Sequence, residues 1–318
     1  MAPSPLELLL FALVGYKLVL PAVVAFYEFF LRAPRKLSKY GEWAVVTGAT
    51  DGIGKALTFE LAKRGMRVFL ISRTESKLKE VQDELEAAFP KLEFKSLPID
   101  FSGGFDAAKR AKVAAALAKL DVGVLVNNVG ISYGFTKYYH ELTELEPVDL
   151  IALNLESTMH MTKIVLGDDA AGMVQRRRGA IVNTSSAAGT QVSPLLAGYS
   201  AAKGGVVAFS KSLGAELAPR GIHVQVQTPL WVTTKLAKIR RTSLSVPSPK
   251  TYACAAVDAI GPKPATSPYW AHALQLWLVD CLPDAVSVAI VSNMHHAIRK
   301  QGLKKEKAKA DGTDKKAQ

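Results

Sequence analysis

The sequence contains too few cysteines to build a disulfide framework. Its 318 residues include two, Cys254 and Cys281, and their spacing is not that of zinc ligands. This excludes the small secreted disulfide scaffolds and the cysteine-based zinc modules. We expect the folded part of the chain to face a reducing compartment.

The chain also lacks the repeats of a solenoid and the motifs of a nucleic-acid-binding protein. Its formal net charge is +12, but much of that charge lies in one carboxyl-terminal segment, residues 299–318. No aromatic residues are interleaved with these lysines, so nucleic acid is not an expected partner. A segment with so few apolar side chains cannot offset its ordering entropy, which predicts a disordered basic tail.

A long apolar run is present near the amino terminus, at residues 6–31. With a rise of about 1.5 Å per residue, a helix of this length can cross a hydrocarbon core of about 30 Å. Basic residues follow the run and none precedes it, so the positive-inside rule places the rest of the chain in the cytosol. Lys17, Pro21 and Glu28 interrupt it, which leaves a monotopic or re-entrant anchor open. We predict a membrane anchor over residues 1–35.

After the anchor, Val/Ile/Leu-rich runs alternate with helical patterns. Continuous apolar runs are typical of strands covered on both faces, as in a parallel sheet. We predict strands at 43–48, 67–73, 94–100, 122–128, 179–186 and 223–229, and helices at 52–65, 75–89 and 107–120. Such alternation builds right-handed βαβ units. The predicted fold is a Rossmann-type, doubly wound α/β domain over residues 36–298.

A second apolar segment lies at residues 269–294, where Asp280, Pro283 and Asp284 interrupt it. These interruptions argue against a further membrane span. The segment can form a pair of core helices, or a surface that contacts the bilayer or lines a substrate tunnel. We slightly favour the second interpretation.

A glycine-rich turn, TGATDGIG, directly follows the first predicted strand and opens the first helix. Glycines in this place allow a tight turn and a close approach of the backbone to a phosphate, which the helix amino terminus then binds. In this strand–turn–helix context the motif predicts a dinucleotide site. The residues expected to contact the cofactor are Gly48, Thr50, Asp51, Gly52, Ile53 and Gly54.

The end of the second strand indicates which nicotinamide cofactor is used. An acidic residue there would accept a hydrogen bond from a free ribose 2′-hydroxyl and repel a 2′-phosphate. This chain has Ser72 and Arg73 instead. Because a guanidinium pairs with phosphate through its planar fork, we predict NADPH.

Tyr199 and Lys203 stand four residues apart in YSAAK, which places both on one face of a helix. An ammonium group near a phenol favours the phenolate and lowers the phenol's pKa, so we expect Tyr199 to exchange a proton with a substrate oxygen. Ser186, at the end of an earlier predicted strand, can bind the same oxygen through its hydroxyl.

Together, TGATDGIG, NNVG, the strand-end serine and YSAAK resemble the short-chain dehydrogenase/reductases, over roughly residues 40–235. The resemblance implies that Tyr199 is the general acid, that Lys203 orients the nicotinamide ribose and tunes the tyrosine, and that Ser186 polarises the carbonyl. It also implies that Asn154 holds a water molecule in a proton relay.

For the cofactor, the same resemblance implies that Asn127 braces the sheet near the adenosine and that Asp100 contacts the adenine. Val232 and Thr234 fall where the nicotinamide and diphosphate are bound in the family. Pro229 is followed by Leu230, where the family usually has glycine.

Further segments, among them LISRTESKL and PLWVTTKLAKIRR, resemble the very-long-chain 3-oxoacyl-CoA reductases of fatty-acid elongation and their hydroxysteroid dehydrogenase relatives. This resemblance implies reduction of a 3-oxoacyl-CoA to the 3-hydroxyacyl-CoA at the endoplasmic reticulum membrane. Lys315 and Lys316 also fit a cytosolic dilysine signal, which returns membrane proteins to the endoplasmic reticulum. A lid is expected over residues 235–265. Its cations can meet the phosphates of CoA or form a solvated face: Lys235, Lys238, Arg240 and Arg241.

Two other functions stay open at this point. A steroid or retinoid ketone reductase would use the same site residues, and a non-catalytic membrane scaffold would need none of them. Expected partners are an acyl-CoA substrate and membrane lipid, with other elongation enzymes and a homodimer as further possibilities.

Overall fold

The structure is a computed structural model, which describes residues 4, 7–8, 12, 15–167, 170–239 and 241–311. It consists of two compact units, Met1–Arg35 and Lys36–Gln318. The second unit carries the sheet and every predicted catalytic residue.

In the first unit the chain is helical from Gly15 to Leu31. A π-helical turn, Gly15–Val19, leads into α2 (Leu20–Phe26), and a second one, Tyr27–Leu31, ends the segment. Val23 and Phe26 are each more than half exposed. Among the described residues no helix combines the length and the apolarity needed to cross a membrane. The predicted run at 6–31 falls partly on positions 6, 9–11 and 13–14, which lie outside the described residues.

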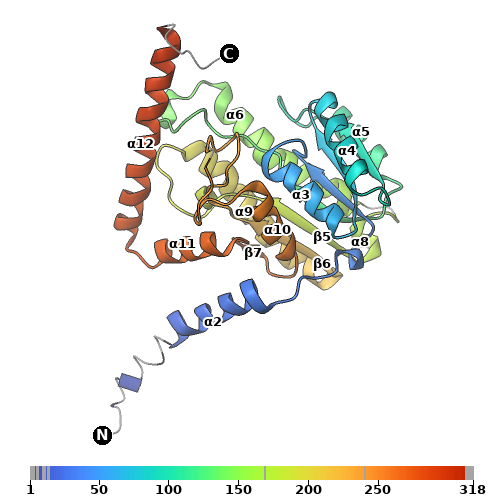
Figure 1. The fold of residues 1–318 in the computed structure, drawn as a ribbon, viewed down its shortest axis with the longest axis horizontal. Coiled ribbons are helices and arrows are strands. Elements are labelled where there is room, and N and C mark those ends of the chain that lie inside the picture. Colours follow the sequence, from blue (N-terminus) through green and yellow to red (C-terminus); the bar gives the residue numbers. More distant parts are fainter. Residues whose placement is uncertain are drawn as a thin grey trace. The chain divides into compact units, whose positions relative to one another are not determined.

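The second unit is built on a seven-stranded parallel sheet with the order β3-β2-β1-β4-β5-β6-β7 (Figure 1). The six longer strands confirm the predicted ones, whereas β7 is too short to leave a pattern in the sequence. The strands are β1 (Trp43–Thr47), β2 (Arg67–Ser72), β3 (Phe94–Pro98), β4 (Val122–Asn127), β5 (Gly179–Thr184), β6 (Ile222–Gln227) and β7 (Ala265–Thr266). The order reverses direction between β1 and β4, which creates the crevice where such sheets bind nucleotides.

Helices cover both faces of the sheet, and each face has its own apolar core. One face is covered by α3 (Gly52–Lys63), α4 (Glu75–Ala88) and α10 (Pro249–Asp258). The other is covered by α5 (Ala107–Leu117), α7 (Ser157–Leu166), α8 (Met173–Arg176) and the long α9 (Ala197–Leu217), with α6 (Leu145–Ile151) beside α9. The Rossmann-type fold is therefore confirmed.

The carboxyl-terminal segment forms two helices, α11 (Trp270–Asp280) and α12 (Asp284–Ala310). They are separated where Asp280 and Pro283 interrupt the sequence. The Thr136 hydroxyl donates to the His295 carbonyl at 2.7 Å, and Arg299 pairs with Glu141 at 2.5 Å. These contacts dock α12 on the loop after β4.

The predicted disorder from Arg299 onward is wrong for residues 299–310, which continue α12. Alanine, lysine, leucine and glutamate are strong helix formers, and the helix is already nucleated by its docked first half. Residues 312–318, which include the dilysine pair, lie outside the described residues.

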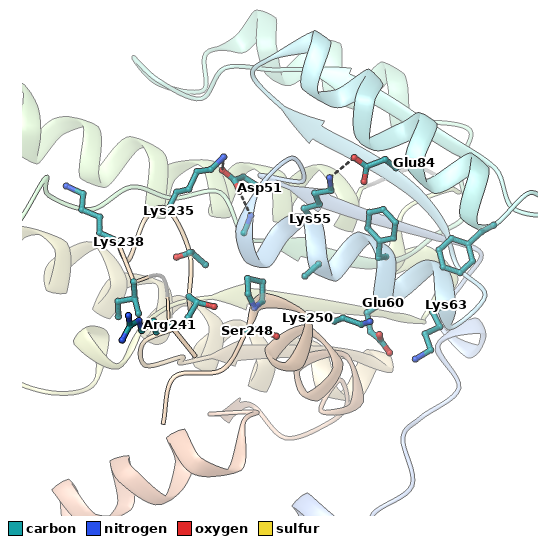
Figure 2. A pocket seen from close by; sticks show the side chains of 18 of the residues that line it. Asp51, Lys55, Glu60, Lys63, Glu84, Lys235, Lys238, Arg241, Ser248 and Lys250 are labelled. Atoms are coloured by element: carbon teal, nitrogen blue, oxygen red, sulfur yellow. Dashed lines mark hydrogen bonds and ion pairs between the residues drawn. The ribbon is translucent and has the colours of Figure 1, made fainter. Parts of the chain in front are cut away.

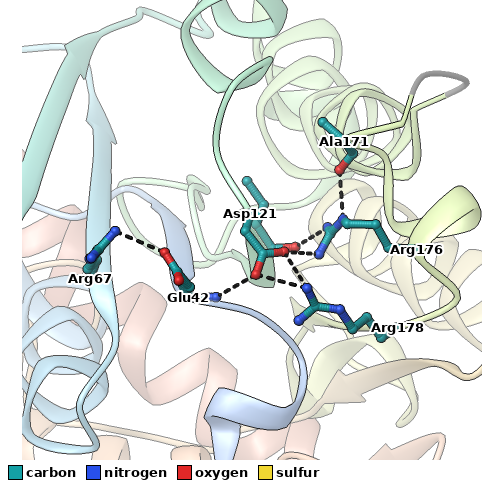
Figure 3. Close-up of polar contacts among 7 residues, drawn as sticks. Glu42, Arg67, Asp121, Ala171, Arg176 and Arg178 are labelled. Carbon is teal, nitrogen blue, oxygen red and sulfur yellow. Dashed lines mark hydrogen bonds and ion pairs between the residues drawn. The ribbon is translucent and has the colours of Figure 1, made fainter.

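An ion-pair cluster closes the opposite, amino-terminal edge of the sheet around Asp121 (Figure 3). Its carboxylate accepts from the guanidinium groups of Arg176 and Arg178, the latter at 3.0 Å, and from the Glu42 amide at 3.2 Å. Glu42 in turn pairs with Arg67 at 2.9 Å. Residues adjoining β1, β2, β4 and β5 are thereby linked at the edge remote from the predicted site.

Candidate active site

The structure brings the predicted site residues together at the carboxyl edge of the sheet. The glycine turn follows β1, Arg73 follows β2, Asp100 follows β3, Ser186 follows β5 and Pro229 follows β6. Because all the strands are parallel, these strand ends share one edge. Tyr199 and Lys203 reach the same edge from the first turns of α9.

The turn after β1 leaves no room for side chains at two of its glycines. Gly48 has a φ of +66°, which favours glycine, and a Cβ on Gly54 would lie 2.0 Å from the Gly48 carbonyl oxygen. Asp51 caps α3 by accepting from the Gly52 amide at 2.8 Å. The amides of Ile53 and Gly54 also belong to the unpaired first turn of the helix, where an anion is bound favourably.

The predicted adenosine end is formed by the residues after β2 and β3. The Ser72 and Thr50 hydroxyls lie 2.9 Å apart, and Arg73 is exposed beside them. Asp100 accepts from the Ser102 amide at 2.9 Å, and this bond, with a smaller contribution from the positive charge of Arg73, lowers the pKa of the Asp100 carboxyl. Arg73 therefore stands close to Asp100 and open to a 2′-phosphate.

Asn127 is buried and links the sheet to α7. Its Nδ2 donates to Asn183 Oδ1 at 2.8 Å and to Thr162 Oγ1 at 3.1 Å. Its Oδ1 has no hydrogen-bond partner among the described residues. The arrangement fits the bracing role that the sequence resemblance implied.

The loop after β6 folds over the glycine turn. Val232 is buried in the core, while the Thr234 methyl group lies 3.2 Å from the position of a Cβ on Gly52. The Pro229 carbonyl accepts from the Ala187 amide at 3.0 Å, which ties this loop to the segment that carries Ser186. Pro229, Val232 and Thr234, which we expect to contact the cofactor, thus belong to the loop that lies beside the turn.

Tyr199 lies next to Ser186, close enough for the Ser186 hydroxyl to influence the pKa of the phenol. Burial raises the pKa of the Tyr199 phenol, and the Ser186 hydroxyl opposes that shift. The lowering of this pKa that we expected from Lys203, whose Nζ lies 5.9 Å from the tyrosine ring centroid, is outweighed by burial. Like an ordinary tyrosine, the phenol is protonated at neutral pH, as a general acid must be, but burial makes it a weaker acid.

Lys203 is 4% exposed, and its Nζ donates to the Thr184 carbonyl at 3.0 Å. Burial lowers the pKa of this ammonium to about 8. A lysine held in this way is costly to bury without a negative charge beside it. The residue therefore has a specific task that a packed apolar side chain could not perform.

Asn154 is 1% exposed and lies in a π-helical turn, Ala152–Glu156, between α6 and α7. Its Nδ2 donates to the Ile131 and Leu150 carbonyls at 3.0 and 2.9 Å, but its Oδ1 lacks a partner among the described residues. A Cβ on Gly130 would lie 2.5 Å from this Oδ1 and 3.3 Å from Lys203 Nζ. The unpaired oxygen and the ammonium thus both face the space beside Gly130. This space is polar, and a water molecule there can bridge the two groups.

Sequence reasoning missed two residues that position this site. The Tyr133 hydroxyl accepts from the Gly198 and Tyr199 amides at 2.8 and 3.3 Å, which holds the first turn of α9. His272 accepts from the Leu230 amide at 3.3 Å and lies 3.2 Å from the Ser245 carbonyl. Both are single aromatic side chains far from Tyr199 in sequence, so no motif spacing marks them.

A family model described as short chain dehydrogenase matches residues 42–244. This range spans more than half of the chain and contains every site residue predicted from the sequence. The chain belongs to the short-chain dehydrogenase/reductase family. The glycine turn, the exposed arginine and the buried Lys203–Asn154 pair fit a nicotinamide dinucleotide, as expected of this family.

The curated relatives of this family member include a very-long-chain 3-oxoacyl-CoA reductase-like protein of Arabidopsis thaliana, 44% identical over 84% of this chain and 85% of the relative. The Homo sapiens very-long-chain 3-oxoacyl-CoA reductase is 43% identical over 84% of both chains.

Among solved structures, the actinorhodin polyketide ketoreductase with NADPH has a TM-score of 0.62 and 33% identity, covering 70% of this chain and 94% of that one. A short-chain dehydrogenase from Sphingobium yanoikuyae in complex with NADPH has a TM-score of 0.60 and 28% identity, covering 68% and 82% of the two chains.

Proposed function

We propose that this short-chain dehydrogenase/reductase uses NADPH to reduce very-long-chain 3-oxoacyl-CoA thioesters to 3-hydroxyacyl-CoA thioesters in fatty-acid elongation. The observation that carries the chemistry is the joint placement of Tyr199, Ser186, Lys203 and Asn154 at one strand edge, with the Lys203 ammonium buried. The substrate class is supported by curated reductases of that name at 43–44% identity over most of the chain.

The cofactor is supported by residues at both ends of its site. Arg73, in place of an acidic residue, offers a positive charge to a 2′-phosphate, and the first turn of α3 offers amides to the diphosphate. Bound NADPH supplies the hydride for C3 of the substrate. Pro229, Val232 and Thr234 border the nicotinamide end.

In the proposed reaction, the ketone oxygen accepts hydrogen bonds from the hydroxyls of Tyr199 and Ser186. As C3 becomes tetrahedral, negative charge develops on that oxygen, and the Tyr199 phenol transfers its proton there. Lys203, through its positive charge, stabilises the tyrosinate that remains. A water molecule between Asn154 Oδ1 and Lys203 Nζ can then return the proton from solvent.

The acyl chain is accommodated by an apolar cluster beside Tyr199. Tyr133, Leu150 and Leu196 are buried together there, with Ile131 and Leu142 packed against them. An apolar wall next to the acid also excludes water from the reacting ketone.

We further propose that the protein is held at the endoplasmic reticulum membrane, with the catalytic unit in the cytosol. The described part of the amino-terminal run supports this with exposed apolar side chains, among them Val19, Val23 and Phe30. A second row of exposed apolar side chains follows α11 and the first half of α12: Leu274, Trp277, Leu278, Leu282, Val286, Ile290 and Met294. A row of this size on the surface favours contact with lipid.

The test of the proposed activity is NADPH oxidation by the detergent-solubilised protein, with a long-chain 3-oxoacyl-CoA and, separately, a 17-ketosteroid. We expect turnover with the CoA thioester and little with the steroid. A preference for the steroid would retain the fold and the acid but overturn the substrate. No oxidation with either would contradict the proposed reaction.

A further inference from the structure

A large basic groove lies between α3 and the loop before α10, next to the cofactor turn (Figure 2). This loop, up to residue 248, is called the lid below; the rest of the predicted lid includes α10, which packs in the core. The volume of the groove is about 1710 Å³, and its walls come from α3, the end of α4, residues 233–239, Arg241, the start of α10 and Lys305 of α12. One end is bordered by Asp51, Gly52 and Thr234, which belong to the proposed cofactor site. The groove continues well beyond these residues along the lid.

The carboxylates of the groove are already paired. Asp51 binds Lys235 at 3.0 Å, Glu84 binds Lys55 at 2.8 Å and Glu60 binds Arg64 at 2.9 Å. The remaining cations of the groove have no carboxylate partner among the described residues: Lys63, Lys238, Arg241, Lys250 and Lys305. The groove therefore carries a surplus of positive charge.

These cations come from parts of the chain that are distant in sequence. Lys238 and Arg241 are in the lid, Lys250 is in the first turn of α10 and Lys305 is near the end of α12. Like charges gathered in a concave surface repel one another and raise the local concentration of anions. A ligand with several phosphates would relieve this repulsion.

The groove is connected to the substrate side of the site. The Lys238 ammonium donates to the Gly134 carbonyl, in the loop that also carries Tyr133. That loop lies against α12, because a Cβ on Gly302 would fall 2.2 Å from the Phe135 ring. The lid loop and α12 thus both contact the loop that carries Tyr133, a member of the apolar cluster beside Tyr199.

We propose that the groove binds the 3′-phosphorylated ADP portion of the CoA thioester, with Arg241, Lys250 and Lys305 as its phosphate contacts. This inference rests on the proposed function for its substrate. With the CoA nucleotide in the groove, the acyl chain of the same substrate can lie at Tyr199. The phosphates of NADPH are assigned to the end of the groove at Gly52 and to Arg73, and the nucleotide of CoA to the part that continues beyond it.

The test compares the full-length protein with the triple variant Arg241→Gln/Lys250→Gln/Lys305→Gln. A matched control, Lys91→Gln/Lys119→Gln/Lys211→Gln, removes three exposed lysines outside the groove. For a long-chain 3-oxoacyl-CoA we expect KM to rise roughly tenfold in the groove variant, and less at high salt. The kcat value, the Kd for NADPH and the KM for the same acyl chain on N-acetylcysteamine should stay within about twofold, because none of them involves the CoA nucleotide.

An unchanged KM for the CoA thioester, or an equal rise for both thioesters, would overturn the proposal. A weakened Kd for NADPH would assign the cations to the cofactor instead and would also overturn it. Calorimetric titration with free CoA decides the question independently of turnover. If the parent protein reduces no 3-oxoacyl-CoA, the proposed function fails. The groove proposal is still supported in that case if the parent binds free CoA and the groove variant does not. Equal CoA binding by both proteins, or none by either, refutes it.

Discussion

Among individual residues, Tyr199 carries the proton transfer in the proposed reaction, and two neighbours prepare it. Tyr133 fixes the amide groups at the start of α9, and the Ser186 hydroxyl opposes the rise in the pKa of the phenol. Because burial raises the pKa of Tyr199, the phenol is a weaker acid than a free tyrosine, and the positive charge of Lys203 is needed to stabilise the tyrosinate that proton transfer leaves.

Replacing Tyr199 with phenylalanine removes the acid but keeps the ring. We expect kcat to fall by about 10³-fold, in the range for loss of a positioned general acid, with the Kd for NADPH within about twofold. Turnover assays and cofactor fluorescence measure these two quantities. The matched control is Tyr252→Phe, because Tyr252 is buried in the core and its hydroxyl has no partner among the described residues. Normal turnover of the Tyr199 variant would remove this residue from the mechanism.

Lys203 makes the stability of the cofactor-free protein depend on pH. Its pKa is about 8 in the folded chain and about 10.4 in an unfolded one. Between these values the unfolded chain binds more protons, so the free energy of unfolding rises with pH. Below pH 8 the full penalty of burying the ammonium applies, about 3 kcal/mol by this shift.

We therefore expect the Lys203→Met variant to be inactive yet more stable than the parent near pH 7, and this advantage to shrink toward pH 10. Denaturant unfolding of both proteins at the two pH values measures the difference. An advantage that does not change with pH would mean that Lys203 keeps its ordinary pKa in the folded protein.

Among the secondary-structure elements, the parallel sheet separates stability from chemistry. The carboxyl edge carries the turn after β1, Ser186 and the loop after β6, whereas the amino edge carries the Asp121 cluster (Figure 3). Asp121 also accepts the Glu42 and Trp43 amides through its carbonyl, at 3.1 and 3.0 Å. It therefore links the start of β1 to that of β4.

Asp121→Ala should destabilise the fold without changing the site. The loss leaves Arg176 without a carboxylate partner, and we expect the free energy of unfolding to fall by on the order of 2 kcal/mol. The Kd for NADPH and the KM for substrate should stay within about twofold, because the cluster lies at the opposite edge. Thermal unfolding and cofactor titration test both parts. A large loss of NADPH affinity at unchanged stability would contradict this separation of the two edges.

On the scale of the whole molecule, the proposed membrane attachment rests on apolar side chains that each of the two units exposes. The first unit exposes Val23 and Phe26, and α11 and α12 expose the second row. A very-long acyl chain is itself more soluble in lipid than in water, so a membrane-bound enzyme can take it from the bilayer.

Charges placed in the amino-terminal run should weaken membrane binding. We expect Val23→Lys/Phe26→Lys in the full chain to shift the protein from the floating to the soluble fraction of a liposome flotation assay, since each lysine is costly within lipid. Leu145→Lys/Val148→Lys, on the exposed face of α6, is the control and should float like the parent. Equal flotation of the run variant and the parent would show that this run is not the anchor.

Local patterns in the sequence determined much of this protein. The apolar runs predicted six strands, and Gly48 and Gly54 predicted the tight turn after β1. The structure shows that a side chain at either position would be strained or would clash with the backbone. The four-residue spacing placed Tyr199 and Lys203 on one helix face. Each of these features depends on neighbours along the chain, so the chain alone encodes it.

Only the tertiary structure decided the features that depend on distant contacts. The packing around Tyr199 decides whether burial or the charge of Lys203 has the larger effect on its pKa. The predicted tail is helical through residue 310 because α12, which it continues, docks on Thr136 and Glu141. Tyr133, His272 and the groove cations come from segments far apart in sequence, and folding alone brings them together. Burial, pKa and charge density are properties of that assembled environment, which no local pattern contains.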